Sequence, residues 1–217
     1  MAIEHPAIEG EATAHTVIER EVVVRTATER QRYRFTAEQY HQMGEAGVFR
    51  PGDRVELIDG EIIEKTRISD PHAGAVNAFT HYFVRRAYKA AVVSPQNPVR
   101  LAERSEPEPD IAILKYRADY YASRGPTPED VLLLIEVADS SVAFDLRVKA
   151  PLYAYNNIPE YWLVDLGRQQ VTVFRQPSAD GYRSMQVYER GASLTLVSLP
   201  DVTITVDEIL GEPIEPA

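Results

Sequence analysis

Apolar residues recur along the chain with two spacings, one typical of helices and one typical of strands. A helix is predicted after Thr36, which suits an N-cap, and it ends at Gly47. A second, longer helix is predicted to begin near Pro71, and a third follows the apolar run that ends at Ala138. The apolar positions that define the last two helices are Val76, Phe79, Phe83 and Tyr88, and then Phe144, Val148, Leu152 and Tyr155.

Strand spacing is clearest in "RVELIDGEIIEKT", where apolar and polar residues alternate around Asp59-Gly60 and predict a β-hairpin. Two runs, "DIAILK" and "VLLLIEVA", are almost continuously apolar, as in strands that are covered on both faces. The segment between them, "YRADYYASRGPTPED", is predicted to be a loop or a short helical excursion. Further short strands are predicted in "NPVRLAE", "YWLVDL", "QVTVFRQ", "YRSMQVYE" and "VTITVDEIL".

The order of these elements is helix, hairpin, helix, strands, helix, strands. That order favours an α/β fold with a mixed central β-sheet flanked by helices. Residues 31–217 are expected to form one domain. Residues 1–30 are polar apart from "EREVVVRT", and they are expected to form a partly disordered extension with at most one edge strand.

The composition of the chain excludes several kinds of site and argues against some classes of function. The chain has 217 residues and no cysteine, which excludes disulfides, thiolate metal sites and cysteine nucleophiles and fits a reducing cytoplasm. No apolar run approaches the roughly 18 residues that a membrane span needs. The net charge of −10 argues against non-specific binding of nucleic acid. It leaves room for a local basic rim, or for an acidic metal site whose ions reverse the local field.

Two carboxylates lie on the runs that look most deeply buried. Asp110 begins "DIAILK" and Glu136 lies within "VLLLIEVA". A buried carboxylate is costly unless it is paired, hydrogen-bonded or bound to a metal, and two neighbouring carboxylates raise each other's pKa. A divalent cation removes that conflict, and Mg²⁺ is commonly held by one or two carboxylates. Lys149, on the predicted third helix, is placed to reach back toward the same point.

These features resemble the Uma-two-type restriction endonucleases, within the PD-(D/E)XK nuclease superfamily. The resemblance covers roughly residues 35 to 190. It rests on segments in the family's order: "VELIDGEII", the helix with His72, "PDIAIL", "LLLIEVADSS", "FDLRVKAPLYAYNNIPEYWLVDL" and "VTVFRQPSADGY". It implies a restriction-endonuclease-like αβββαβ core, to which an N-terminal helix and hairpin and C-terminal strands are added, and hydrolysis of DNA phosphodiester bonds.

The same resemblance assigns roles. Asp110 and Glu136 are expected to bind Mg²⁺ or Mn²⁺, helped by the backbone carbonyl of Val137. Lys149 is expected to orient the attacking water, because the motif's usual lysine position holds Ala138. Glu56 matches a further acid near the site, and it is expected to hold the metal directly or through water. Cutting both strands of DNA would be simplest with a homodimer.

Simpler interpretations remain open for several of these residues. Asp145 and Lys149 are four positions apart and could form an exposed helix ion pair. Glu56 could be an exposed hairpin residue, and His72 could be a helix cap or a surface residue. Pro151 predicts that the third helix starts late or kinks.

The remaining candidate residues are expected to have structural or surface roles. Arg85, Arg86 and Lys89 are expected to be a solvated helix face, and Tyr161 and Trp162 to be core residues. The alternative function is a catalytically inactive nuclease-fold protein that acts as a binding or assembly module. The net charge and Pro151 favour this alternative, and the acid-acid-lysine set favours the enzyme.

Overall fold

The computed structural model describes residues 32–211. The chain divides into two units between Arg32 and Tyr33, and the fold below belongs to the second unit. The expected edge strand in "EREVVVRT" lies outside the described residues.

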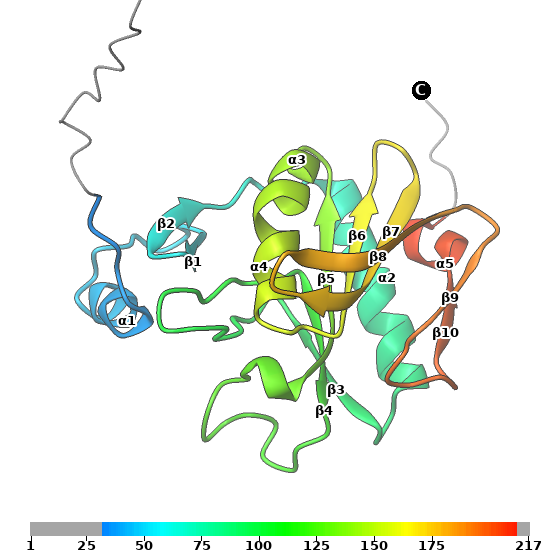
Figure 1. The fold of residues 1–217 in the computed structure, drawn as a ribbon, viewed down its shortest axis with the longest axis horizontal. Helices are drawn as coiled ribbons and strands as arrows, with labels where there is room; N and C mark the ends of the chain where they lie inside the picture. Colours follow the sequence, from blue (N-terminus) through cyan, green and yellow to red (C-terminus); the bar gives the residue numbers. More distant parts are fainter. Residues whose placement is uncertain (1–31, 212–217) are drawn as a thin grey trace, which may run out of the picture. The chain divides into compact units, whose positions relative to one another are not determined.

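A six-stranded sheet forms the centre of this unit, with strand order β3-β4-β5-β6-β7-β8 (Figure 1). Only β5 and β6 run parallel, so the sheet is mixed, and a helical segment crosses between them. The α/β fold class predicted from the sequence is therefore confirmed. The strands are β3 (Ala91–Pro95), β4 (Ile111–Lys115), β5 (Val131–Ala138), β6 (Glu160–Asp165), β7 (Gln170–Ser178) and β8 (Gly181–Glu189).

Helices cover both faces of the sheet (Figure 1). On one face, Ile135 and Val137 of β5 pack in one core cluster with Phe79 of α2 (Asp70–Arg86). On the other face, Leu134 packs with Tyr153 of α4 (Ala150–Tyr155). Because side chains alternate along a strand, Glu136 shares the α4 face with Leu134. The covering segments on this second face are α3 (Val142–Phe144), a π-helical turn (Asp145–Lys149) and α4 (Ala150–Tyr155).

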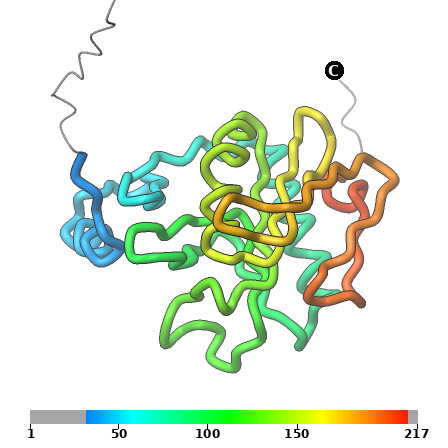
Figure 2. Tube along the Cα trace, viewed as in Figure 1, coloured from blue at the N-terminus to red at the C-terminus, as the bar shows by residue number. Residues whose placement is uncertain are grey.

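The smaller elements surround this core. The predicted hairpin is present as β1 (Val55–Ile58) and β2 (Glu61–Glu64), and α1 (Ala37–Glu45) begins with the predicted N-cap. The hairpin trace runs beside the segment that precedes β4 (Figure 2), to which Leu57 is bridged through Glu106. The C-terminal elements are β9 (Ser193–Thr195), β10 (Thr203–Thr205) and α5 (Val206–Leu210).

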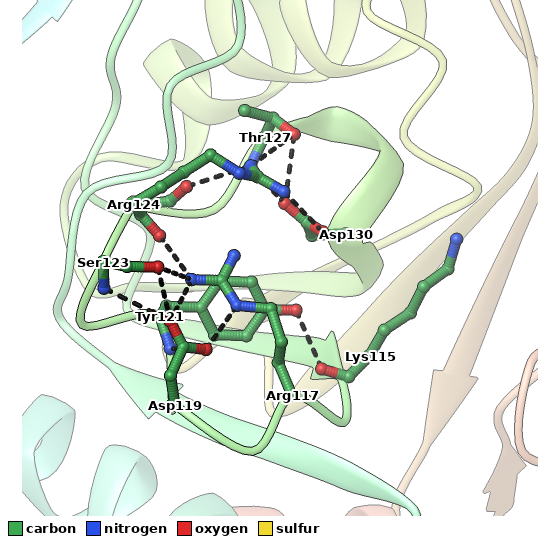
Figure 3. Close-up of polar contacts among 9 residues, drawn as sticks. Lys115, Arg117, Asp119, Tyr121, Ser123, Arg124, Thr127 and Asp130 are labelled. Carbon is green, nitrogen blue, oxygen red and sulfur yellow. Dashed lines mark hydrogen bonds and ion pairs between the residues drawn. The ribbon is translucent and has the colours of Figure 1, made fainter.

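Polar side chains hold the loop between β4 and β5, which contains only the short 3-10 turn η1 (Pro128–Asp130) (Figure 3). Arg117 pairs with Asp119, and Arg124 pairs with Asp130 at 2.9 Å. These ion pairs hold the loop where regular backbone pairing is missing. The loop predicted for this segment is confirmed.

Several predicted elements are wrong. The segment "NPVRLAE" forms no strand, and the strand that pairs with β4 is instead β3, which begins at Ala91. The segment "VTITVDEIL" splits into β10 and α5, because Thr205 caps a helix where the strand would otherwise continue. Tyr88 lies beyond the end of α2 and is 73% exposed.

The third predicted helix is present but turns a different face inward. Its expected apolar positions are only partly buried or exposed: Phe144, Val148, Leu152 and Tyr155. The buried positions are instead Asp145, Lys149, Ala150, Tyr153 and Ala154. On this face Lys149 pairs with Glu136, while Ala150 and Tyr153 pack in the core cluster that contains Leu134.

Candidate functional site

A cavity of about 320 Å³ lies where β5, the hairpin, the start of α2 and the helical segment after β5 meet. All five site residues predicted from the sequence line it: Glu56, Asp110, Glu136, Val137 and Lys149. His72 and Asp145 line it as well. The structure therefore brings together residues from four separate parts of the chain.

Lys149 is the centre of a buried polar network. Its Nζ donates to Glu136 Oε1 at 2.9 Å and lies 3.1 Å from Glu56 Oε1. The hydroxyl of Tyr153 donates to the same Glu136 oxygen at 2.6 Å. The side chains of Lys149 and Glu136 are each 4% exposed, and that of Glu56 is 2% exposed. Both carboxylates therefore depend on one ammonium for charge compensation.

The interpretation of Asp145 and Lys149 as an exposed ion pair is wrong, because both residues are only 3% exposed. Asp145 accepts instead from the hydroxyl of Ser141 at 2.6 Å. Glu56 is likewise buried and not an exposed hairpin residue, and its second oxygen accepts from the Glu108 N–H at 3.1 Å.

The inward direction of Lys149 follows from a local change in helix type. The Ala150 N–H donates to the Asp145 carbonyl five residues back, which defines a π turn. Pro151 follows this turn directly. The backbone stays helical through Lys149 and Ala150, so the helix does not start late at Pro151, and the departure from α-helical geometry is the π turn just before it.

Asp110 is held by the backbone of the neighbouring strand. The pairing of β4 with β5 ends at Ile111 and Ile135, so the Val137 N–H is free to donate to Asp110 Oδ2 at 2.9 Å. The other oxygen, Asp110 Oδ1, lies 3.1 Å from His72 Nε2. That contact lacks hydrogen-bond alignment, and both atoms are buried without a hydrogen-bond partner among residues 32–211.

His72 is the residue that sequence reasoning undervalued. It lies in the first turn of α2, where Ser69 caps the helix and accepts from the His72 N–H at 3.4 Å. Its side chain is 13% exposed and points to Asp110 rather than to the surface. The sequence feature that could have indicated this role is the position of His72 in the first turn after the Ser69 cap, because side chains there point toward the structure that the helix N-terminus faces.

The charges in the cavity do not balance. Burial raises the pKa of Glu136 to about 8, and the charges of Asp110 and Asp145 add to burial, while Lys149 opposes it. Burial also raises the pKa of the Asp145 carboxyl. For Lys149, burial alone lowers the pKa, but Glu136, Glu56 and Asp145 outweigh burial and raise it. The ammonium of Lys149 is therefore the fixed charge of this ion pair, because three carboxylates face it.

Asp110 differs from the other buried acids. Burial raises its pKa, but the contact and charge of His72, the charge of Lys65 and the Val137 N–H together lower it below its ordinary value. Asp110 is therefore ionised at neutral pH, and its Oδ1 atom is buried beside His72.

Basic residues of the hairpin region form a rim on the same cavity. Arg54, Lys65 and Arg67 all line it. Lys65 lies 3.1 Å and Arg54 3.6 Å from the carboxylate of Glu108, whereas Arg67 has no ion-pair partner in the described part of the chain. A cavity with acids at its base and cations at its rim suits a ligand that is itself anionic.

The donor atoms suit a hard divalent cation that keeps most of its water. Within residues 32–211, no group of three or more His, Cys, Asp or Glu side chains is arranged to hold a metal ion unaided. Mg²⁺ needs fewer, because it is usually held by one or two carboxylates together with waters and phosphate oxygens. The ionised carboxylate of Asp110 and the excess of buried carboxylates fit such an ion.

The fold is that of a nuclease-like α/β protein. A crystal structure described as a putative nuclease belonging to DUF820 from Anabaena variabilis has a similar fold, with a TM-score of 0.61. It is 14% identical in sequence, and the match covers 81% of this chain and 97% of that chain. The sequence model of the Uma2 family, described as "Putative restriction endonuclease", matches residues 37–207. The chain belongs to the Uma2 family. No protein of curated function matches it.

No helix in the described part of the chain is long and apolar enough to cross a bilayer.

Proposed function

We propose that this protein is a metal-dependent endonuclease that hydrolyses DNA phosphodiester bonds at the cavity around Asp110 and Glu136. The observation that carries the proposal is the group of buried carboxylates that line one cavity: Glu56, Asp110, Glu136 and Asp145 lie there with one buried ammonium, that of Lys149. Buried negative charge of this kind is costly without a cation. Membership of a family described as restriction endonucleases supports nucleic acid as the substrate.

The proposed ligands are Asp110, Glu136 and the carbonyl of Val137, with Mg²⁺ or Mn²⁺ as the ion. When bound, such an ion polarises the scissile phosphate and lowers the pKa of water. Val137 suits this role because its N–H already faces Asp110, and the N–H and carbonyl of one strand residue point to the same side. His72 keeps Asp110 ionised and lies against its Oδ1 atom.

Lys149 holds the attacking water in this proposal. Its Nζ is fixed between Glu136 and Glu56, so one of its three protons remains to orient a water or to contact a phosphate oxygen. Glu56 keeps the ammonium in place. Glu56 belongs to the hairpin and accepts a hydrogen bond from the Glu108 N–H, so the position of the hairpin determines where this carboxylate lies in the site. The raised pKa of Lys149 keeps it charged throughout the working range.

The rim cations Arg54, Lys65 and Arg67 are placed to contact the phosphates that flank the scissile bond. This local basic rim reconciles a DNA substrate with the net charge of −10. Location in the cytoplasm is part of the proposal, because a chain without cysteine suits a reducing compartment.

The test is a cleavage assay on a mixed pool of DNA: supercoiled plasmid, linear duplex, single strands and branched junctions. We expect cleavage products with Mn²⁺ and none with EDTA. Asp110→Asn and Glu136→Gln keep the size of each side chain and should lose cleavage by orders of magnitude while remaining folded.

Arg85→Gln is the matched control, because this residue lies in the last turn of α2 and does not line the cavity. It should cleave as the wild type does. Cleavage that persists in EDTA, or that survives in folded Asp110→Asn, would contradict the proposal. A pool in which no substrate is cut with any divalent ion would favour the inactive binding module.

A further inference from the structure

Two apolar side chains line the cavity although they lie outside the core clusters. Ile63 of β2 and Phe144 of α3 are both partly buried, and both line the cavity. Neither belongs to the two core clusters that the described residues form. Apolar surface of these two residues is therefore presented to the same cavity that holds the buried carboxylates.

The pairing of the hairpin explains why Ile63 faces the site. Ile63 is the Cα partner of Glu56 in the antiparallel pair of β1 and β2. Directly opposed residues of such a pair carry their side chains on the same face, and Glu56 reaches Lys149 from this face. Lys65, two residues after Ile63, follows the same alternation and lines the cavity. One face of the hairpin therefore brings an acid, an apolar side chain and a cation to the site.

Phe144 contributes to a different wall of the cavity. It is the last residue of α3 and directly precedes Asp145, which also lines the cavity. Its helical spacing predicts burial in the core, but the side chain is only partly buried. An aromatic ring in the wall of a polar cavity suits a flat ligand that has a π face.

An unpaired nucleotide combines the features that this cavity matches. Its phosphate suits the rim cations, and its base has flat faces that stack on aromatic side chains. Within a duplex those faces are covered by neighbouring bases, so a base offers its face to a protein only when it is unpaired or flipped out. The cavity, about 320 Å³, is at the lower end of the range of roughly 300–1,000 Å³ for small-ligand pockets, which fits one nucleotide better than a duplex.

The depth of the acids points the same way. The side chains of Asp110 and Glu136 are only 5% and 4% exposed. A scissile phosphate must therefore enter the cavity to reach them, and a single strand bends into a cavity more easily than a paired one.

We propose that the cavity takes one unpaired nucleotide, with its base against Phe144 and Ile63, so that the protein acts on single-stranded or locally unpaired DNA. This inference rests on the proposed function, because it names the form of DNA that the proposed site accepts. The occupant is a nucleotide and not a purely apolar ligand, because Arg54, Lys65 and the buried acids line the same cavity.

Binding in EDTA tests the inference without cleavage. The probe is a short fluorescein-labelled oligonucleotide, free or annealed to its full complement, and the measurement is fluorescence anisotropy. We expect the single strand to bind about tenfold more tightly than the duplex, or better, because only its bases are free to stack. Phe144→Ala should weaken single-strand binding by about 5- to 100-fold, as expected for the loss of one stacked base.

Two variants serve as controls for this loss. Phe144→Tyr keeps the aromatic ring and should bind the single strand as the wild type does. Leu146→Ala should also bind as the wild type does, because Leu146 is 38% exposed on the same helical segment and does not line the cavity.

Cleavage with Mn²⁺ then locates the bound nucleotide. A duplex with an internal unpaired loop should be cut within that loop, and the fully paired duplex should be cut far more slowly. An abasic position next to the cleaved bond should weaken binding to the wild type and cause no further loss in Phe144→Ala.

Equal binding of single strand and duplex, no binding of either, or unchanged single-strand binding in folded Phe144→Ala would overturn the inference. Binding as expected without cleavage by any divalent ion would uphold the inference and count against the proposed function.

Discussion

Replacement of Lys149 by methionine is the sharpest perturbation of the buried network. Methionine keeps the length and apolar stem of the side chain but removes the ammonium. Glu136 and Glu56 then lose the cation that lies 2.9 Å and 3.1 Å from them. Removal of one partner from a buried ion pair typically costs about 3–5 kcal/mol, because the remaining charge is left uncompensated.

The cost depends on pH, because Glu136 can take up a proton. Its pKa in the folded protein, about 8, lies above the ordinary value of 4.5. The protonated form of Glu136 therefore makes its full contribution to the free energy of unfolding below pH 4.5. This contribution is lost as the pH rises through 8. Without the ammonium the pKa of Glu136 rises further. We expect Lys149→Met to destabilise the metal-free protein by about 3–5 kcal/mol near pH 9 and by clearly less near pH 6.

The measurement is urea unfolding in EDTA at the two pH values, followed by the cleavage assay with Mn²⁺ at a temperature where the variant is folded. Lys115→Met is the matched control, because this lysine is exposed at the end of β4 and forms no ion pair in the described part of the chain. It should change stability by less than about 0.5 kcal/mol. A pH-independent cost below about 1 kcal/mol, with cleavage intact, would refute both the structural and the catalytic assignment of Lys149.

Three further predictions test separate contacts of the fold, one of them within the site. Tyr153→Phe removes the hydroxyl that donates to Glu136 at 2.6 Å; it should cost about 2 kcal/mol in urea unfolding and raise the pKa of the carboxyl further. Gly60→Ala should cost at least about 2 kcal/mol, because Gly60 has φ 75° and an added Cβ would lie 2.7 Å from the Arg34 Cβ. The hydrogen bond from Arg86 lowers the pKa of Glu208 to about 2, so this pair stabilises the fold above pH 4.5 and loses its effect as the pH falls toward 2. The stability difference between wild type and Glu208→Gln, about 1 kcal/mol for this partly exposed pair, should therefore vanish on acidification.

The central strands and the hairpin could be predicted because their signals are local. Continuous apolar runs specify β4 and β5, and the Asp59-Gly60 turn fixes the register of the hairpin through positive φ at both residues. Alternation along β5 also places Glu136 on one face of the sheet, so its convergence with the following helix follows from strand periodicity.

What could not be predicted depends on contacts between distant segments. The inward face of the helix after β5 is set by Glu136 and Glu56, which attract Lys149 although apolar spacing favours another face. Strand β3 is short, with three apolar residues before Ser94 and Pro95, and all five of its residues pair with the edge that β4 offers. The role of His72 depends on where the start of α2 meets β4, which no spacing within α2 encodes.

The most direct test of the account compares two titrations with free Mn²⁺ on the same wild-type protein: the rate of DNA cleavage and the rise in the free energy of unfolding. If the carboxylates of the cavity bind the catalytic ion, both titrations should give the same dissociation constant, with a stability gain of about 2.7 kcal/mol at a hundredfold excess over that constant. Asp110→Asn should lose both responses together. Cleavage that saturates with Mn²⁺ in Asp110→Asn as it does in the wild type, or stabilisation by Mn²⁺ that is unchanged in this variant, would contradict the assignment of the site.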